Sequence, residues 1–427
     1  MKRIQVPVED LQLGMYVANL DRSWLDSPFL FQGFLLEREE DLNTLRSICR
    51  HVEVDESLST SVDGLGRTPN NTPPPQAAPP EKPAPSRVNL NPPPQRAAGP
   101  LEPDKVMHAL RVGRENREKT HGYLKTLFRD LRLGHTVDTD EARGFVRGMV
   151  DTITDYPDVA IWLTQMKDRD EYTSIHCLNV CVLAVAFCRQ LGYAKTDLET
   201  IGIGALMHDI GKAKTPEHIL NKPGPLTPEE WQIMQQHPED GYQMLRGSSA
   251  IPEASLHIIR GHHRRVNGSG YPDIFPQDEL SAPVLATAIA DVYDAMTSDR
   301  SYHHAMAADE VLRRMRKSAG QTFGHELMEE FIRCVGIFPV GSVVELGNGS
   351  LALVISSGRT ERLLPQVVLL RDNRGKRPDK RKLVDLAVAA RNHPGPDWQI
   401  RRVVEPGRHN ISGNELTLAD MGDSSAR

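Results

Sequence analysis

The chain has 427 residues, enough for two or three domains, and 39% of them are hydrophobic, an ordinary share for a globular protein. Lysine and arginine number 51 and aspartate and glutamate 57, a formal net charge of −6, which gives no reason to expect a nucleic acid polymer as a partner. No apolar run reaches the roughly 20 residues of a membrane-spanning helix, and the first residues lack the apolar stretch of a signal peptide. We therefore expect a cytoplasmic location and no membrane span.

Residues 1–60 predict a small α+β module. The stretches "RIQVPV", "GMYVANL" and "PFLFQGFLL" have the composition of short strands. "EEDLNTLRSIC" places apolar residues at helical spacing, and "HVEVD" alternates like a further strand. A unit of this size lies near the lower limit for a stable core, and the sequence leaves open whether its role is sensory or structural.

Residues 61–103 are rich in proline, as in "NNTPPPQAAPPEKPAP". Proline has no N–H to donate to a helix or a sheet, and the segment has too few apolar residues to build a core. It predicts an extended linker. The alternative is a ligand for a proline-reading module.

The remaining chain changes its periodicity once. Residues 104–340 predict helices, for example in "DKVMHALRVGRENREKTHGYLKTLFRDL" and "EYTSIHCLNVCVLAVAFCRQLG". Residues 341–408 predict strands: "GSVVELGNGSLALVISS" holds two β-branched runs joined by a hairpin signal, and "PQVVLLRD" and "WQIRRVVE" follow. Residues 409–427 predict a flexible tail. The predicted fold class is mainly α, with a helical bundle between two small units that contain strands.

Candidate metal ligands gather in the helical region. Each lies in or just beyond an apolar segment, where an unpaired charge would be costly. A single histidine in such a place is usually an ordinary hydrogen-bonded residue. A His-Asp pair, a His-His pair and an aspartate in an apolar run, all in one domain, instead predict two metals that share a bridging carboxylate. The candidates are His176, His208, Asp209, His237, His262, His263 and Asp291.

The order of these motifs resembles the HD-GYP family. "HDIGK", "ILNKPGPLTPEEW", "HHRRVNGSGYP" and "ADVYDAMTSDRSY" carry the resemblance, which runs over about residues 172–341. It implies a helical HD-domain bundle that hydrolyses cyclic di-GMP, a bacterial second messenger, with a cluster of two or three metals. Residues 1–60 resemble a small module of unknown role that often precedes such domains.

The resemblance also implies a ligand set. Asp209 would bridge the two metals. Iron or manganese is implied, and the nitrogen and oxygen donors suit nickel or zinc as well. One metal would take His176, His208, Asp209 and Asp291, and the other would take Asp209, His237, His262 and His263.

The expected mechanism is an in-line displacement at phosphorus. Two metals about 3.5–4 Å apart can hold a bridging hydroxide that attacks the phosphate, giving pGpG and, with a wide pocket, GMP. We assign catalysis to His208, Asp209 and Lys212. Lys212, the weaker candidate Lys222, Arg300 and His303 would contact substrate, together with the loop residues Gly270, Tyr271 and Pro272. The family ties that loop to substrate fit and to contacts with diguanylate cyclases.

Three departures from the family pattern affect substrate contacts. Arg264 stands where the family usually has glutamate, and Asn267 where it has aspartate. Ser301 and His303 replace the usual residues of the "DRPYR" pattern. None of these changes removes a predicted metal ligand.

The sequence leaves open which of three functions the chain has and whether it binds two metals or three. A non-catalytic cyclic di-GMP sensor or adaptor, and an HD-type hydrolase of another nucleotide, are the alternatives. Some family members hold a third metal with a glutamate one helical turn before the first histidine, and here that position is Tyr172. A neutral phenol is a poor ligand for a divalent ion, so we expect two metals unless Glu171 takes the role. The oligomeric state is not indicated.

Overall fold

The structure is a computed structural model that describes residues 3–21, 34–36, 39–55, 59, 103–133, 139–165, 172–222, 224, 226–298, 306–356, 361, 363–378, 382–404, 409 and 411. Nearly all of the proline-rich segment and of the C-terminal tail lies outside the described residues, and so do Glu171, Arg300 and His303. The chain divides into two compact units, Met1–Arg87 and Val88–Arg427. The finer domain bounds expected at residues 60, 103 and 340 stay predictions.

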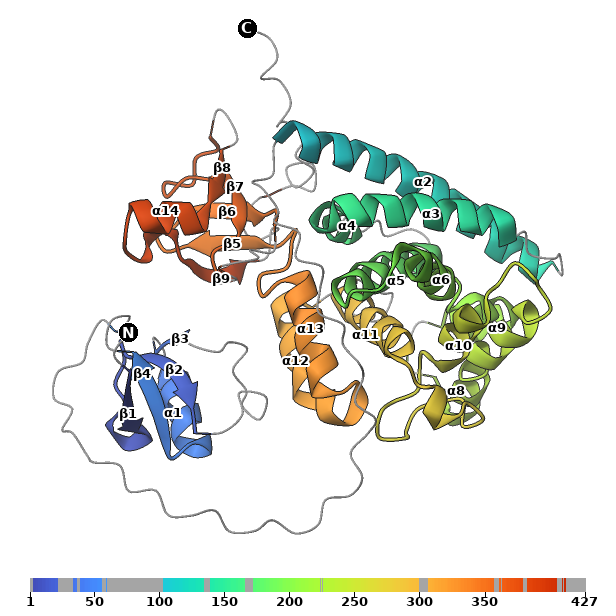
Figure 1. The fold of residues 1–427 in the computed structure, drawn as a ribbon, viewed down its shortest axis with the longest axis horizontal. Coiled ribbons are helices and arrows are strands. Elements are labelled where there is room, and N and C mark those ends of the chain that lie inside the picture. Colours follow the sequence, from blue (N-terminus) through green and yellow to red (C-terminus); the bar gives the residue numbers. More distant parts are fainter. Residues whose placement is uncertain are drawn as a thin grey trace, which may run out of the picture. The chain divides into compact units, whose positions relative to one another are not determined.

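The N-terminal unit is an antiparallel sheet with a helix against it (Figure 1). The strand order is β1-β4-β2-β3, and the central strand β4 pairs with both β1 and β2. The α+β character predicted for this region is therefore confirmed. Its elements are β1 Arg3–Pro7, η1 Val8–Asp10, β2 Tyr16–Leu20, β3 Phe34–Leu35, α1 Glu39–Ile48 and β4 His51–Asp55.

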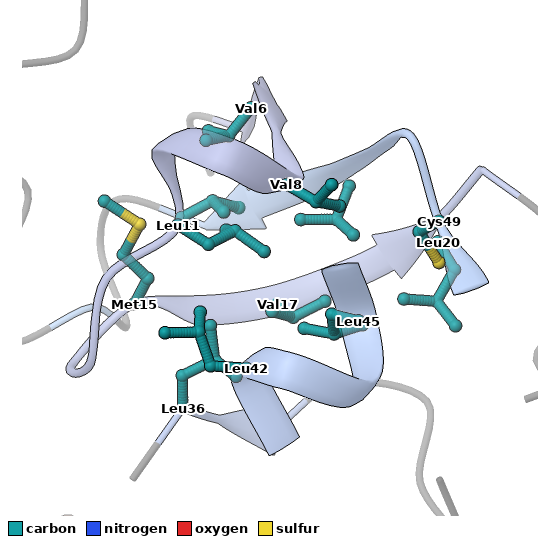
Figure 2. Packing of buried hydrophobic residues seen from close by; sticks show 12 residues of the cluster. Val6, Val8, Leu11, Met15, Val17, Leu20, Leu36, Leu42, Leu45 and Cys49 are labelled. Atoms are coloured by element: carbon teal, nitrogen blue, oxygen red, sulfur yellow. The ribbon is translucent and has the colours of Figure 1, made fainter. Parts of the chain in front are cut away.

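This unit has its own hydrophobic core (Figure 2). Side chains that alternate along a strand point to opposite faces, so Val52 and Val54 of β4 turn the same way as their neighbours on β2. Val17, Val54 and Leu45 are fully buried. Burying such a side chain contributes about 1.5–3 kcal/mol, so even this small unit gains stability from its apolar face.

The helical part of the second unit is built around α5. This helix packs against α2, α3, α4, α6, α11 and α13, and it is buried from residue 174 to 188, which explains why its sequence has no polar face. By length and composition Thr173–Gln190 is also long and apolar enough to cross a membrane, but 83% of that window is buried inside the fold.

The predicted mainly helical fold class is confirmed (Figure 1). The helices are α2 Pro103–Arg132, α3 Thr139–Asp155, α4 Pro157–Thr164, α5 Tyr172–Gln190, α6 Lys195–Leu206, η3 Ile210–Lys214, α7 Glu217–Leu220, α8 Pro228–Met234, α9 His237–Leu245, α10 Glu253–Gly261, η4 Gln277–Glu279, α11 Ala282–Thr297, α12 Ala308–Thr322 and α13 His325–Val335.

The C-terminal strands form an antiparallel sheet in the order β8-β7-β6-β5-β9. The predicted hairpin joins β5 and β6, and Gly349 in its turn has a φ of 86°, a conformation that glycine adopts without strain. The strand β8 and the helix α14 were not predicted from the sequence. The elements are β5 Val343–Leu346, β6 Leu351–Val354, β7 Gln366–Arg371, β8 Leu383–Asp385, α14 Leu386–Asn392, η5 Pro396–Trp398 and β9 Ile400–Val404.

The helix α6 ends before its apolar sequence pattern does. The apolar pattern runs through "GALMHDIGK", but α6 stops at Leu206, so His208 and Asp209 lie in a turn rather than in the last helical turn. The backbone tightens there, because Ile210 N–H donates to Met207 O and Lys212 N–H donates to Asp209 O, three residues back in each case.

Candidate metal centre

The predicted ligand candidates come together where five helices begin, end or pass. His176 lies in α5 and Asp291 in α11, both on the buried faces of these helices. The other candidates lie at helix ends, where the chain can turn side chains toward a common point. His208 and Asp209 follow α6, His237 is the first residue of α9, and His262 and His263 follow α10.

Asp209 stands between two groups of imidazoles. Its Oδ1 lies 3.2 Å from His237 Nε2 and 4.0 Å from His262 Nε2. Its Oδ2 lies 3.5 Å from His208 Nε2 and 3.9 Å from His176 Nε2. The two oxygens of one carboxylate therefore face different histidines, which is the arrangement that a bridging ligand requires.

Two clusters of donor atoms result. In one, His176, His208 and Asp291 place a ligand atom each within 4.8 Å of one another. In the other, His237, His262 and His263 do the same. Asp291 reaches toward both: its Oδ1 is 3.0 Å from His176 Nε2, and its Oδ2 is 4.0 Å from His263 Nδ1.

The orientation of four imidazoles is fixed by their second ring nitrogen. A carbonyl or carboxylate oxygen only accepts hydrogen bonds, so each Nδ1 carries a proton. In His208, His237 and His262 the Nε2 atom then presents its lone pair, whereas His176 Nε2 faces a second carboxylate, that of Asp291. The three carbonyls lie near helix ends, where carbonyls lack a helical partner. The pairs are His176 Nδ1 with Asp294 Oδ2 (2.7 Å), His208 Nδ1 with Ala205 O (2.8 Å), His237 Nδ1 with Met234 O (2.7 Å) and His262 Nδ1 with Ile259 O (2.8 Å).

These lone pairs fit a cation. His208 Nε2 is buried and has no hydrogen-bond partner among the residues that the structure describes. His237 Nε2 and His262 Nε2 lie 3.2 Å apart although both act as acceptors in this tautomer. A buried acceptor without a donor costs about 1–3 kcal/mol, and a divalent cation among these atoms would remove that cost. The donor set of nitrogen and oxygen therefore fits metal ions.

The electrostatics keep most candidates in the protonation state that binds metals. Burial raises the pKa of the Asp209 carboxyl, but Lys212 and His208 outweigh this effect and hold it well below its usual range. Burial lowers the pKa of His208, and it lowers the pKa of His262 well below its usual range. Asp209 is thus an anion and these imidazoles are neutral at pH 7.

His176 differs from the other histidines. Burial by itself would lower its pKa, but hydrogen bonds with Asp291 and Asp294 overcome this and raise the pKa to about 9. Two carboxylates therefore attract a proton or another cation to this position. A metal bound beside Asp291 would supply the positive charge in place of the proton.

The candidate phosphate contacts fall into three groups. Lys212 Nζ lies 2.6 Å from Asp209 Oδ2, at the edge of the cluster. Lys222 forms an ion pair with Glu230, at 2.5 Å, and no contact with the cluster is recorded for it among the described residues. Arg300 and His303 lie outside the described residues. All four roles stay predictions.

The loop at Gly270–Tyr271–Pro272 covers one face of the cluster. Gly270 has a φ of 89°, and a Cβ there would lie 2.0 Å from His263 O, so the loop backbone lies directly against the ligand candidate. The Tyr271 ring stacks on His263 with centroids 4.4 Å apart. Tyr271 is also edge-on to Trp231 of α8, whose centroid is 6.1 Å away and whose side chain is 47% exposed.

Sequence reasoning missed three residues that contact this site. Asp294 bonds to His176, and Asn179 donates to Asp294 with a distance of 2.9 Å. The sequence contains a signal for both residues. Asp294 is three residues after Asp291 and Asn179 is three after His176, so each shares a helix face with a predicted ligand. Trp231 ends the motif "ILNKPGPLTPEEW", which carries the family resemblance, but the sequence alone did not place its ring beside Tyr271.

The comparisons with known proteins identify the family. A family model described as an HD domain matches residues 151–327, and one described as a domain of unknown function (DUF3391) matches residues 3–142. The cyclic di-GMP phosphodiesterase PA4108 of Pseudomonas aeruginosa is 33% identical over 409 residues, which cover 94% of each chain. The chain belongs to the HD-GYP family of cyclic di-GMP phosphodiesterases. It is accordingly an enzyme, a phosphodiesterase.

Other HD-GYP relatives match over a shorter length. The 3'3'-cGAMP-specific phosphodiesterase 2 of Vibrio cholerae is 32% identical over 165 residues, 38% of this chain and 32% of that protein. Among solved structures, Bd1817, a HDG"Y"P protein from Bdellovibrio bacteriovorus, covers 77% of this chain and 98% of its own, with a TM-score of 0.43 and 14% identity.

Proposed function

We propose that this HD-GYP protein hydrolyses cyclic di-GMP to pGpG with two divalent metals held at the candidate centre. The observation that carries the proposal is the position of Asp209, whose two carboxylate oxygens face separate histidine groups at 3.2–4.0 Å. The full-length similarity to a cyclic di-GMP phosphodiesterase supports the choice of substrate.

The residues divide into two metal sites that share Asp209. His176, His208 and Asp291 would complete one site, and His237, His262 and His263 the other. When bound, such a pair of ions supplies Lewis acids for phosphate oxygens and lowers the pKa of a water molecule to about 7. Iron and manganese are the proposed ions, and the absence of sulfur from these two groups is compatible with both.

Cys177 is a less suitable ligand. Its sulfur lies within 4.8 Å of donor atoms of His208 and Asp209. Burial, aided by the nearby Asp209, raises the pKa of the Cys177 thiol well above its usual range. Only the thiolate binds metals well, so the nitrogen and oxygen donors are favoured.

Lys212 supplies a positive charge beside the bridging carboxylate. Its ammonium is partly exposed and hydrogen-bonds to Asp209 Oδ2 at 2.6 Å, and the pairing with Asp209 keeps its pKa raised despite the burial that lowers it. Once metals neutralise Asp209, the same ammonium is available to hold a phosphate oxygen. We assign Lys212 to substrate phosphate for this reason.

The aromatic side chains at the loop suit the bases of the substrate. His263, Tyr271 and Trp231 form a row of ring contacts that leads from the metal candidates to the surface. Every nucleobase has a face that stacks on an aromatic ring, a contact worth about 1–3 kcal/mol per base. We therefore assign Trp231 to a guanine of cyclic di-GMP.

Two other functions remain as alternatives. A relative specific for 3'3'-cGAMP matches the HD region, so a different cyclic dinucleotide is one. A non-catalytic cyclic di-GMP sensor or adaptor is the other, and the complete set of ligand candidates speaks against it. Cleavage on to GMP, binding of diguanylate cyclases at the loop, and a cytoplasmic location stay predictions.

One experiment separates these alternatives. Anaerobically purified protein is analysed for bound metals and incubated with cyclic di-GMP, 3'3'-cGAMP and pGpG, and the products are identified. We expect close to two iron or manganese ions per chain and pGpG as the first product. A third ion that is lost in Glu171→Ala would replace the two-metal proposal with a three-metal one.

Two histidine variants test the site itself. His262 and His257 both belong to the α10 region, but His257 is 34% exposed and faces Glu253 and Glu279. We expect His262→Ala to lose metal and activity and His257→Ala to keep both. Equal activity in the two variants would show that the cluster is not the catalytic centre.

A further inference from the structure

A chain of buried hydrogen bonds connects the metal centre to α2. Asp294 accepts from His176 Nδ1 through its Oδ2, at 2.7 Å, and from Asn179 Nδ2 through its Oδ1, at 2.9 Å. Asn179 Oδ1 in turn accepts from Arg117 NH1 at 2.7 Å. His176, Asn179 and Asp294 are each no more than 2% exposed, so the bonds between them are buried, whereas the bond from Arg117 is partly buried.

The residues of this chain come from three helices. His176 and Asn179 lie one turn apart on α5, Asp294 lies on α11, and Arg117 lies on α2. The HD-domain match begins only at residue 151, whereas α2 falls within residues 3–142, the match to the domain of unknown function. A side chain from the N-terminal family match is therefore linked, through Asn179 and Asp294, to a candidate ligand of the catalytic domain.

We infer that Arg117 is a positioning residue for His176, acting through Asn179 and Asp294, and that α2 thereby sets how tightly the first metal is held. The inference rests on the proposed two-metal function. It adds a route by which the region before the HD domain acts on catalysis without touching substrate.

The physical reason is the direction of the Asn179 amide. A guanidinium only donates hydrogen bonds and a carboxylate only accepts them. Asn179 must therefore turn its oxygen to Arg117 and its NH2 group to Asp294. If the amide were flipped, its NH2 group would face the Arg117 donor and its oxygen would face the Asp294 carboxylate, so neither hydrogen bond could form. Arg117 and Asp294 thus favour the same amide orientation, and Arg117 anchors its oxygen side.

That orientation is transmitted to the metal ligand. Asp294, held by Asn179, accepts the Nδ1 proton of His176, and the opposite ring nitrogen then points at Asp291 Oδ1, 3.0 Å away. Without Arg117, the buried oxygen of Asn179 loses this donor, and only the NH2 group, which donates to Asp294 Oδ1 at 2.9 Å and to Thr164 O at 3.4 Å, still holds the amide in place. Asp294 and His176 then have more freedom, and an imidazole that is less well oriented binds metal more weakly.

The size of the effect follows from the position of Arg117. Changing a partner that bonds directly to a metal ligand typically costs about 10–100-fold in metal affinity. Arg117 acts two hydrogen bonds further away. We therefore expect a loss of about tenfold, at the lower end of that range.

The test compares arginines of the same helix. Arg117→Ala removes the donor, and Arg117→Lys keeps a cation that can still donate to Asn179. Arg111→Ala is the matched control, because the Arg111 side chain is 64% exposed and its recorded partners are the neighbouring residues Glu115, at 3.3 Å, and His108, at 3.4 Å, on the surface of the same helix. Metal-free full-length protein of each variant is titrated with Mn²⁺, with cyclic di-GMP turnover as one readout and the melting temperature of the metal-free protein as the other.

We expect Arg117→Ala to need about tenfold more Mn²⁺ for half-maximal activity, with a kcat at saturating Mn²⁺ within about twofold of the parent. Arg117→Lys should recover most of the loss, and Arg111→Ala should match the parent. Direct Mn²⁺ binding, measured without substrate, should show the same order of variants.

Two results would overturn the inference. One is an unchanged Mn²⁺ requirement in Arg117→Ala. The other is a lower melting temperature of metal-free Arg117→Ala with unchanged Mn²⁺ binding, which would make the residue merely structural. A parent protein that binds no Mn²⁺ and turns over no cyclic dinucleotide would instead contradict the proposed function, and this outcome is recognised before any variant is compared.

Discussion

The contact between η3 and α9 is a sensitive point of the metal centre. Gly211 follows Asp209 by two residues, and a Cβ at Gly211 would lie 1.9 Å from His237 O and 2.6 Å from Gly241 N. Real Cβ atoms essentially never approach a neighbour closer than 3.0 Å. Gly211→Ala must therefore separate η3 from α9 by at least 3.0 − 1.9 = 1.1 Å. Both sides of this contact are backbone, so no flexible side chain can yield instead.

This separation acts directly on the proposed ligands. Asp209 precedes η3 and His237 begins α9, and their facing atoms Oδ1 and Nε2 are 3.2 Å apart. Misplacing a catalytic group by about 1 Å can cost about 100-fold in rate, and overpacking a core costs about 1–3 kcal/mol. We expect a folded Gly211→Ala protein with kcat lowered about 100-fold and with less than the full complement of metal.

The assay measures cyclic di-GMP turnover, metal content and melting temperature on the same samples. Gly247→Ala is the control, since Gly247 follows α9 and nothing lies within 4 Å of a Cβ built there. If Gly211→Ala keeps the turnover and metal content of Gly247→Ala, the close packing of η3 on α9 does not hold the ligands in place. That result would refute the reasoning.

Asp209→Ala should abolish hydrolysis and lower the amount of both metals bound, because each ion loses a ligand and charge balance. Turnover near the parent level would contradict the two-metal proposal. The melting temperature of the metal-free protein should be highest near pH 6.5–7. It should fall toward acid because burial lowers the pKa of His262 and His263 well below 6.5, so below that pH the unfolded chain binds more protons. It should also fall toward alkali, because the pKa of His176 is raised to about 9 and its stabilisation is lost as the pH rises from 6.5 through that value. A melting temperature that rises steadily from pH 6 to 9 would contradict this balance. Trp231→Ala should raise the KM for cyclic di-GMP about tenfold with little change in kcat, since a stacked base contributes binding at a distance from the reacting phosphate; an unchanged KM would remove Trp231 from the substrate site.

The metal ligand candidates could be predicted from the sequence because their chemistry is local. A His-Asp pair or a His-His pair at the end of an apolar helix is unusual in itself, and its order along the chain carries the family resemblance. Most strands of the two sheets could also be predicted from the sequence, since strand alternation and the Gly-Asn-Gly-Ser turn are short-range signals. These features need no knowledge of which helices are neighbours.

The supporting contacts could not be predicted because they join distant residues. His176 and Asp294 are 118 positions apart, and Arg117 and Asn179 are 62 apart. Their bonds depend on the packing of α5 against α2 and α11, which a single sequence does not specify. The early end of α6 is likewise accompanied by a long-range contact, since the chain after Leu206 brings Gly211 against the backbone of α9.

Arg264 shows how a departure from the family pattern is accommodated by the fold. The resemblance implies a glutamate at this position, after the paired histidines, yet the arginine here is only 6% exposed. Its NH1 donates to Gly270 O at 3.1 Å and its NH2 to Gln277 Oε1 at 3.3 Å, so it joins the start of the loop to its end. Asp273 lies 3.5 Å away, but its side chain is fully exposed, and such a pair contributes little.

The charge of Arg264 is therefore balanced mainly by the dipoles of a carbonyl and an amide rather than by a carboxylate. A glutamate could not make these two bonds, because both partners present oxygen to it. With arginine, the loop is held against His263, and Tyr271 stays stacked on that ring at 4.4 Å. The substitution consequently changes what supports the loop, and it leaves the predicted metal ligands and their orienting hydrogen bonds in place.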